Sequence, residues 1–224
     1  MAYPRFFVAR TRPTPSARAA VDVGRRVVDF VGAAVLLVLL SLLMLLIALA
    51  VRVEDRGPAL FRQERVGLGR RRFKMLKFRT MTQGVDDTDL RDLIARELNG
   101  EDTTVNGSSK LNNDRRVTRI GAILRRTSLD ELPQLINVLR GDMALIGPRP
   151  CLDWEADMFP PEYASRFSVR PGLTGLWQVS GRSTLGTLDM LRLDVQYVRT
   201  RSLRGDLGIL LRTVPVLLRR DGAR

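Results

Sequence analysis

Two adjacent carboxylates, Asp130 and Glu131, stand in the stretch SLDELPQL (residues 128–135), shortly after the basic pair Arg125 and Arg126. Arginines can hold a phosphoryl group through paired hydrogen bonds, and a carboxylate beside them can attack it. A structural role competes with this interpretation, because Asp is among the best helix N-caps and Ser128 and Glu131 have capping-box spacing.

Pro133 decides between two helix starts. If Ser128 were the cap, Pro133 would be the fifth helical residue, where proline forfeits a backbone hydrogen bond and clashes with the preceding turn. If Asp130 is the cap, Pro133 falls in the first turn, where a missing N–H is tolerated. We therefore predict a helix from Asp130 to Arg140 with the acids at its N-terminus, where the helix dipole favours anions such as phosphate.

Three further arginines stand in loops rich in glycine and proline. Arg149 lies between two prolines, Arg170 precedes a Pro-Gly turn, and Arg182 follows a glycine. Proline limits the entropy lost when a side chain is fixed, and glycine lets the backbone approach a ligand closely. Rigid loops that carry arginines suit a diphosphate, whereas a solvated basic surface would not need glycine and proline beside its arginines.

The composition limits the classes of molecule that the protein can bind. The chain has 224 residues, 45% of them hydrophobic, and a formal charge of +13, so it is a folded protein whose partner is anionic: a phosphorylated ligand, acidic lipid or nucleic acid. There is no histidine, so acids must do the acid-base and metal-binding work. Cys151 is the one cysteine, which excludes an intramolecular disulfide, and we expect it to be a packing residue.

An uncharged stretch, residues 30–51, indicates membrane insertion. As a helix it would be about 33 Å long, enough to cross a bilayer. A cleavable signal peptide is the weaker alternative, because the apolar core exceeds the usual ~7 to 15 residues. Arginines flank the stretch on both sides, so the positive-inside rule favours cytoplasm for both ends.

Such a helix must enter the membrane and turn back. The Ser41 hydroxyl, bonding to the Leu37 carbonyl, could bend it. A single crossing remains the alternative.

The remaining elements follow from periodicity and turn residues. We predict a hairpin from residues 59–66 and 71–80, a helix over 88–98, and a helix over 117–126 with Val117, Ile120, Ile123 and Leu124 facing inward. The apolar and basic segment 206–220 could lie on a membrane surface, or pack in the core with Pro215 as a kink.

The motifs KFRTM, SLDELPQLINVLRGDMALIGPRP and VRPGLTGLWQVSGR closely resemble the bacterial sugar transferases, the monotopic phosphoglycosyl transferases that begin lipid-linked glycan assembly. The resemblance runs from about Arg25 to Arg220. It implies transfer of a sugar phosphate from a UDP-sugar donor to undecaprenyl phosphate, with release of UMP and use of Mg²⁺. The residues it assigns are the nucleophile Asp130, the Mg²⁺ ligand Glu131, and the phosphate- or nucleotide-binding Lys77, Arg125, Arg149, Arg170 and Arg182.

The expected fold is a helix-rich α+β monotopic membrane protein. Its parts are a basic cytoplasmic tail (1–20), a membrane-inserted, re-entrant helix (21–56) and a cytoplasmic catalytic domain (57–224) with a flexible insert at 84–113, all at the bacterial inner membrane. Two departures from the family stand out. Leu42 replaces the proline that usually follows Ser41, and Ala144 replaces a common Ser or Thr.

Other functions remain open from the sequence. A non-catalytic membrane-surface scaffold would use the same charge to hold anionic lipid or assembly partners. Nucleic-acid binding fits the net charge, but the chain has no base-stacking or groove-reading motif. The sequence leaves the transferred sugar and the oligomeric state, monomer or homodimer, undetermined.

Overall fold

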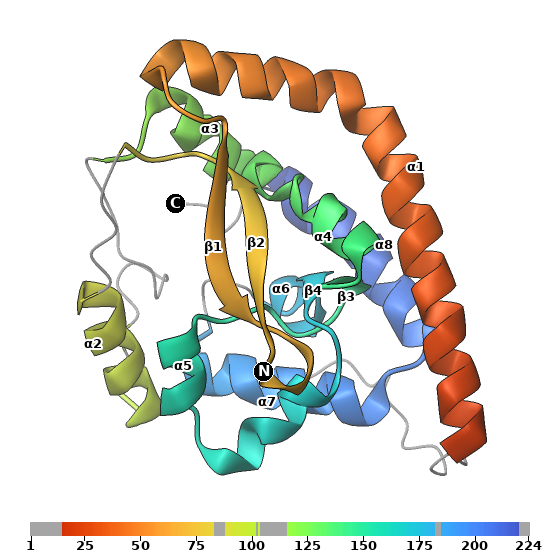
Figure 1. The fold of residues 1–224 in the computed structure, drawn as a ribbon. Coiled ribbons are helices and arrows are strands. Elements are labelled where there is room, and N and C mark those ends of the chain that lie inside the picture. Colours follow the sequence, from red (N-terminus) through yellow and green to blue (C-terminus); the bar gives the residue numbers. More distant parts are fainter. Residues whose placement is uncertain (1–14, 83–87, 102, 104–115, 182–184, 220–224) are drawn as a thin grey trace.

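The computed structural model describes residues 15–82, 88–101, 103, 116–181 and 185–219. It is a helix-rich α+β structure, as predicted. One long helix, α1 (Pro15–Asp55), runs along one side of the domain formed by the other elements and across its end (Figure 1). The helix begins at Pro15, earlier than the expected boundary at residue 21. Proline is favoured at the first helical position, and the alanine-rich residues after it extend the helix.

The predicted hairpin is confirmed. Strand β1 (Leu60–Val66) pairs antiparallel with β2 (Arg72–Phe78), in a register that places Leu60 opposite Phe78. A 3-10 turn, η1 (Leu68–Arg70), joins them, and Gly69 within it has φ 62°. A positive φ of this size is strained for most residues but accessible to glycine, so the hairpin closes here.

A second, parallel pair of strands, seven shorter α-helices and two 3-10 helices form the rest of the described chain. These elements are α2 (Thr88–Leu98), α3 (Arg119–Thr127), η2 (Leu129–Glu131), α4 (Gln134–Arg140), β3 (Ala144–Ile146), α5 (Asp153–Met158), η3 (Pro161–Ser168), β4 (Gly172–Thr174), α6 (Leu176–Val179), α7 (Thr187–Thr200) and α8 (Leu203–Arg219). The predicted helix 88–98 is confirmed as α2. Pro215 lies within α8.

The predicted helix 117–126 exists as α3, but one inward residue is wrong. Ile123 is 52% exposed, whereas Leu124 is buried with Phe78 and the α1 residues Ile47 and Val51. A helix of nine residues presents one face to its neighbours, and Ile123 falls outside that face.

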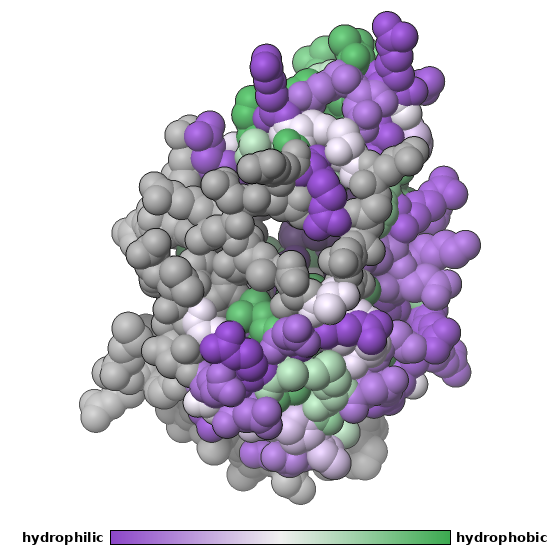
Figure 2. Space-filling model, turned by 90° about the vertical axis from the view of Figure 1, so that its left-hand side faces the viewer, coloured by the Kyte–Doolittle hydropathy of each residue, from purple (hydrophilic) through white to green (hydrophobic). Residues whose placement is uncertain are grey.

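Most of the apolar stretch of α1 lies outside the protein core. Ala33 is fully buried against α4 and β3, yet Val38 and Leu39 are 75% and 72% exposed. Within the described part of the chain, α1 is the one helix long and apolar enough to cross a membrane. By contrast, the side of the domain opposite α1, on the left in Figure 1, is largely hydrophilic where it is coloured (Figure 2).

Polar contacts tie both ends of α1 to the same domain. Near its start, Arg26 donates to the Val138 and Leu139 carbonyls at 2.6 and 2.8 Å, at the C-terminal end of α4. Near its end, the Glu54 carboxylate accepts from the Arg119 backbone N–H at 2.8 Å, at the start of α3. Each contact satisfies backbone groups that a helix end leaves unpaired.

Between these contacts α1 bends (Figure 1). The Ser41 hydroxyl donates to the Val38 carbonyl at 2.8 Å, so the predicted bond to Leu37 is wrong by one residue. Both are local bonds to the preceding turn, of the kind that bends helices.

Candidate active site

The dyad of Asp130 and Glu131 lies in the 3-10 turn η2, between α3 and α4. The predicted helix from Asp130 to Arg140 is wrong at its start, because α4 begins only at Gln134. Its predicted end at Arg140 is confirmed.

Ser128 explains the difference. It adopts a left-handed conformation with φ 56°, which ends α3, and its side chain forms no cap. The backbone N–H groups of Glu131 and Leu132 then bond to carbonyls three residues earlier. This tight pattern gives a 3-10 turn, and an α-helix follows only after Pro133.

Glu131 is held by two cations from distant parts of the chain. Lys77 Nζ, from β2, and Arg149 Nη2, from the loop after β3, each lie 3.2 Å from Glu131 Oε1. The Glu131 charge is the main cause that raises the pKa of Arg149, and burial lowers the pKa of Lys77 although Glu131 opposes it. Glu131 therefore fixes both cations at one point beside the dyad.

Asp130 is different from its neighbour. It is 8% exposed, yet its carboxylate accepts no hydrogen bond and forms no ion pair within the described residues. Burial raises the pKa of Asp130, and the nearby charge of Lys77 works against that rise. A buried carboxylate without a partner is unfavourable, so its presence here indicates a functional group.

Arg125 completes the cationic surroundings of Asp130. The Arg125 charge lowers the pKa of Asp130, though less than the Lys77 charge does. Arg125 Nη2 also donates to Met81 Sδ at 3.3 Å. The structure thus brings Lys77, Arg125 and Arg149 together around the dyad.

Arg170 is not gathered there. Arg170 Nε donates to the Gly141 carbonyl at 2.9 Å, at the end of α4 opposite the dyad. Its guanidinium satisfies a helix C-terminal carbonyl, a common role for arginine. Arg182 lies outside the described residues.

Lys77 owes its position to a buried amide that the sequence analysis missed. Asn137, on α4, is fully buried; its Oδ1 accepts from the Leu76 N–H at 3.0 Å and its Nδ2 donates to the Lys74 carbonyl at 2.8 Å. The amide thereby fixes β2 against α4 just before Lys77. The sequence did contain a sign of this role, because Asn137 is a single amide between the apolar residues of QLINVL.

The loop that carries Arg149 depends on close packing of two backbones. A Cβ on Gly172 would lie 2.0 Å from the Gly147 nitrogen, so a larger residue would push β3 and β4 apart. The loop then passes to Cys151, which is buried, as expected of a packing residue. Burial also raises the pKa of its thiol.

Two further residues behind this loop, Arg166 and Asp194, were also missed. They form an ion pair of 2.8 Å in the protein interior. Asp194 interrupts the apolar face of α7 between Leu191 and Val195, which was a readable signal. Arg166 had no local signal, because its partner is 28 residues away.

The dyad fits Mg²⁺ that is bound together with a substrate. No group of three or more Asp, Glu, Cys or His side chains that could hold a metal occurs in the part of the chain described. Mg²⁺ usually takes one or two carboxylates and completes its shell with substrate phosphates and water. Glu131 beside Asp130 meets that minimal requirement.

Known proteins resemble the chain over most of its length. Residues 20–220 match the family model described as "Bacterial sugar transferase". A UDP-glucose:undecaprenyl-phosphate glucose-1-phosphate transferase of Caulobacter vibrioides is 48% identical over 93% of this chain and 75% of its own length. The exopolysaccharide production protein ExoY of Rhizobium meliloti is 39% identical, over 91% of this chain and 89% of its own.

A longer relative, the undecaprenyl-phosphate galactose phosphotransferase of Salmonella typhimurium, is 39% identical over 89% of this chain but only 41% of its own length. The chain therefore spans less than half of that protein. These matches confirm the predicted resemblance.

Proposed function

The chain belongs to the bacterial sugar transferase family, and from this premise we propose that it moves a sugar 1-phosphate from a UDP-sugar to undecaprenyl phosphate. The transfer would release UMP and begin the assembly of a polysaccharide or glycoconjugate. The observation that carries the mechanism is the contrast within the dyad: Glu131 is paired with two cations, whereas Asp130 is buried and has no partner among the residues that the structure describes.

In the first step, an oxygen of the Asp130 carboxylate attacks the phosphorus that bears the sugar. The bond from this phosphorus to the oxygen of UMP breaks, UMP leaves with that electron pair, and an aspartyl phosphosugar remains. The carboxylate needs no separate base, because it attacks in its ionised form. Lys77, Arg125 and Arg149 bind and orient the diphosphate. Their positive charges also offset the repulsion between the diphosphate and the Asp130 carboxylate.

In the second step, a phosphate oxygen of the lipid attacks the same phosphorus. The bond to Asp130 breaks, the carboxylate is regenerated, and the product is a lipid diphosphate sugar. Glu131 would help to hold Mg²⁺, which supplies charge neutralisation of the diphosphate when it is bound. Glu131 also keeps Lys77 and Arg149 at the phosphate position between turnovers.

Turnover with a defined substrate panel tests this proposal. Purified protein, Mg²⁺, undecaprenyl phosphate and several UDP-sugars should give UMP, and Asp130→Asn should abolish its release. Without the lipid, the intact native protein should gain the mass of one sugar phosphate, located at Asp130. As control, Asp153→Asn, at an exposed ion pair with Arg72, should keep full activity. UMP release by Asp130→Asn at the native rate would refute the nucleophile.

We also propose that α1 enters the membrane from the cytoplasmic face and returns to it, so that the protein is monotopic. The polar contacts of Arg26 and Glu54 support this, because they lie on either side of the apolar stretch and reach the same domain. A helix that crossed the bilayer would carry one of these contacts to the opposite side. The bend of α1 and its exposed apolar side chains are consistent with insertion.

Cysteine labelling tests this topology. In a Cys151→Ser background, Val23→Cys and Val53→Cys place exposed thiols before and after the apolar stretch. An impermeant maleimide should label both thiols in inside-out vesicles and neither in intact spheroplasts. Labelling of one thiol from each side would show a single crossing instead.

A further inference from the structure

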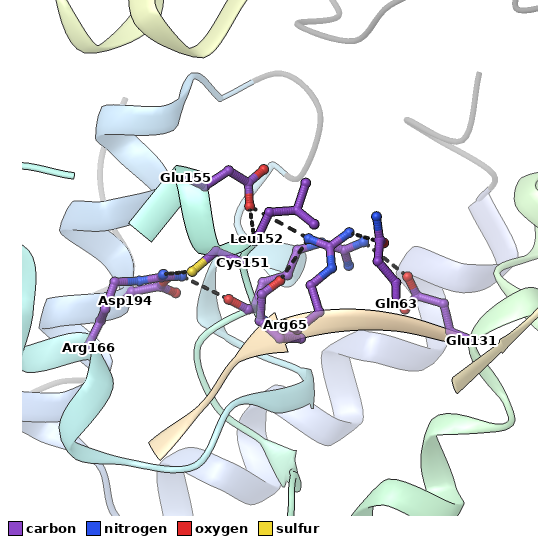
Figure 3. A network of polar contacts seen from close by, with 10 residues as sticks. Gln63, Arg65, Glu131, Cys151, Leu152, Glu155, Arg166 and Asp194 are labelled. Carbon is purple, nitrogen blue, oxygen red and sulfur yellow. Dashed lines mark hydrogen bonds and ion pairs between the residues drawn. The ribbon is translucent and has the colours of Figure 1, made fainter. Parts of the chain in front are cut away.

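Figure 3 shows a network of polar contacts in which Arg166 bonds to Cys151 and Arg65 lies between Gln63 and Glu155. Within this region, the backbone that carries Arg149 is held at three successive carbonyl groups, those of residues 149–151. Each carbonyl accepts a hydrogen bond from a donor on another element. The pairs are Arg166 Nη2 with Arg149 (2.8 Å), Arg65 Nη1 with Pro150 (3.4 Å), and the Val66 N–H with Cys151 (2.9 Å). The contact from Arg166 reaches the residue whose side chain binds Glu131.

The Arg166 guanidinium is fully engaged in the interior. Its Nε and Nη2 donate to Asp194 Oδ2 at 3.1 and 2.8 Å, and its Nη1 donates to Cys151 Sγ at 3.2 Å. The rings of Phe159 and Phe167 lie 4.9 and 5.2 Å from the guanidinium carbon. Both the charge and the orientation of Arg166 are therefore fixed.

Stability alone does not explain this pair. The Arg166 and Asp194 side chains are 1% and 2% exposed, so both charges lose their hydration on folding. The desolvation of a buried ion pair can exceed its attraction, and well-packed apolar residues in its place are often neutral or stabilising. An apolar pair would fill the same space, but it would offer the Arg149 carbonyl no donor.

We propose that the Arg166–Asp194 pair positions Arg149 for the transfer reaction. Asp194 orients the Arg166 guanidinium, Arg166 fixes the Arg149 carbonyl, and the Arg149 side chain is thereby aimed at Glu131 and at the phosphate beside it. The inference rests on the proposed function for its effect on turnover. Arg166 and Asp194 act as positioning residues, since neither contacts the dyad.

An apolar replacement of both partners separates position from stability. In Arg166→Met/Asp194→Leu, the Met sulfur can pack against the two phenyl rings, and no charge is left unpaired. We expect a melting temperature equal to or above that of the native protein. The rate of phosphosugar-enzyme formation should nevertheless fall by roughly 10- to 100-fold, because a small misplacement of a binding group has an effect of this size. A stable double variant with native rates would overturn the proposal.

A second readout does not depend on turnover. Modification of Arg149 by phenylglyoxal, followed by peptide mass spectrometry, should be faster in the double variant, because its guanidinium is no longer held at Glu131. An unchanged rate would contradict the positioning role even if no UDP-sugar proved to be a substrate. The matched control is Arg72→Met/Asp153→Leu at an exposed ion pair, which should alter neither Arg149 modification nor turnover.

If the double variant unfolds, Arg166→Lys provides the test, combined with Arg149→Ala in a mutant cycle. A lysine keeps a positive charge beside Asp194 but cannot reach the same set of acceptors. If Arg166 acts through Arg149, Arg166→Lys lowers the rate in the native background and has no further effect in Arg149→Ala. Equal losses in both backgrounds would show a purely structural role and overturn the inference.

Discussion

Two of the buried acids in this molecule, Asp206 and Asp130, have opposite surroundings. Where α1 begins, Asp206 of α8 has a partner on each oxygen: Arg25 Nε lies 3.0 Å from Oδ2, and the Tyr197 hydroxyl donates to Oδ1 at 3.1 Å. In the dyad, Asp130 is as deeply buried but has no partner among the described residues. Burial raises the pKa of both carboxyl groups.

The comparison separates an acid that links elements of the fold from one that does not. The Asp206 cluster joins α1, α7 and α8, and its charges serve to hold helices together. Asp130 links no elements within the described part of the chain, so its burial costs stability. Local rules of protein stability are broken mainly at functional sites, and this acid breaks one of them.

The largest expected effect is the loss of activity in Asp130→Asn. Removing a covalent nucleophile should lower the transfer rate at least about a thousandfold. Stability should stay unchanged or rise, because burial raises the folded pKa of Asp130, and its ionisation destabilises the fold as the pH rises through that pKa. Turnover and thermal unfolding in detergent measure the two effects. A strongly destabilised Asp130→Asn would make this acid a structural one.

Asp206→Asn should give the reverse result. The amide still accepts from Tyr197, but the buried Arg25 charge loses its nearer counter-ion and keeps Asp22 at 3.9 Å, which should lower stability by about 3 kcal/mol. Turnover by the protein that remains folded should be close to native. Thermal unfolding and the activity per folded molecule test this. A variant that keeps native stability but loses turnover would erase the contrast between the two regions.

The pH dependence of turnover tests the role of Lys77, because its charge is the largest of those that lower the pKa of Asp130 against the effect of burial. As the pH falls through this pKa, Asp130 gains a proton and cannot attack, so kcat/KM falls on the acid side. Lys77→Met removes the opposing charge, and the acid limb should move to higher pH. An acid limb that does not move would mean that another group limits the reaction.

The alkaline side reports on Lys77 itself. Burial lowers its pKa, so the ammonium group and its contact with Glu131 are lost as the pH rises through the lowered value. Lys77→Arg keeps the charge, because a guanidinium does not lose its proton in this range. In this variant the alkaline limb of kcat/KM should move to higher pH while the acid limb stays in place.

The sequence predicts what depends on neighbouring residues. The hairpin follows from its alternation and glycines, and α2 from its apolar spacing. The motif led us to predict a functional role for the dyad, but it did not predict the 3-10 turn, because that turn depends on the left-handed Ser128. The rules for helix N-caps assume an extended backbone at the capping residue, so they do not predict a left-handed serine.

The supports behind the site could not be predicted in the same way. Asn137, Arg166 and Asp194 act across 17 to 63 residues of sequence, so their partners become neighbours only after folding. Arg170 shows the converse: its Pro-Gly turn resembled that of a phosphate loop, but the fold directs it to the far end of α4.

The smallest effect is expected for Leu42→Pro, which restores the proline that this chain lacks after Ser41. Proline would remove one backbone hydrogen bond in α1, but the helix already bends, and the Ser41 hydroxyl already bonds to the Val38 carbonyl. Leu42 is 67% exposed, so its side chain makes little packing contact within the protein. Turnover in membranes should therefore stay within about twofold of native, since proline reinforces a kink that serine can begin. A large loss would mean that the bend must stay shallow, and that the anchors at Arg26 and Glu54 tolerate only one path of the helix between them.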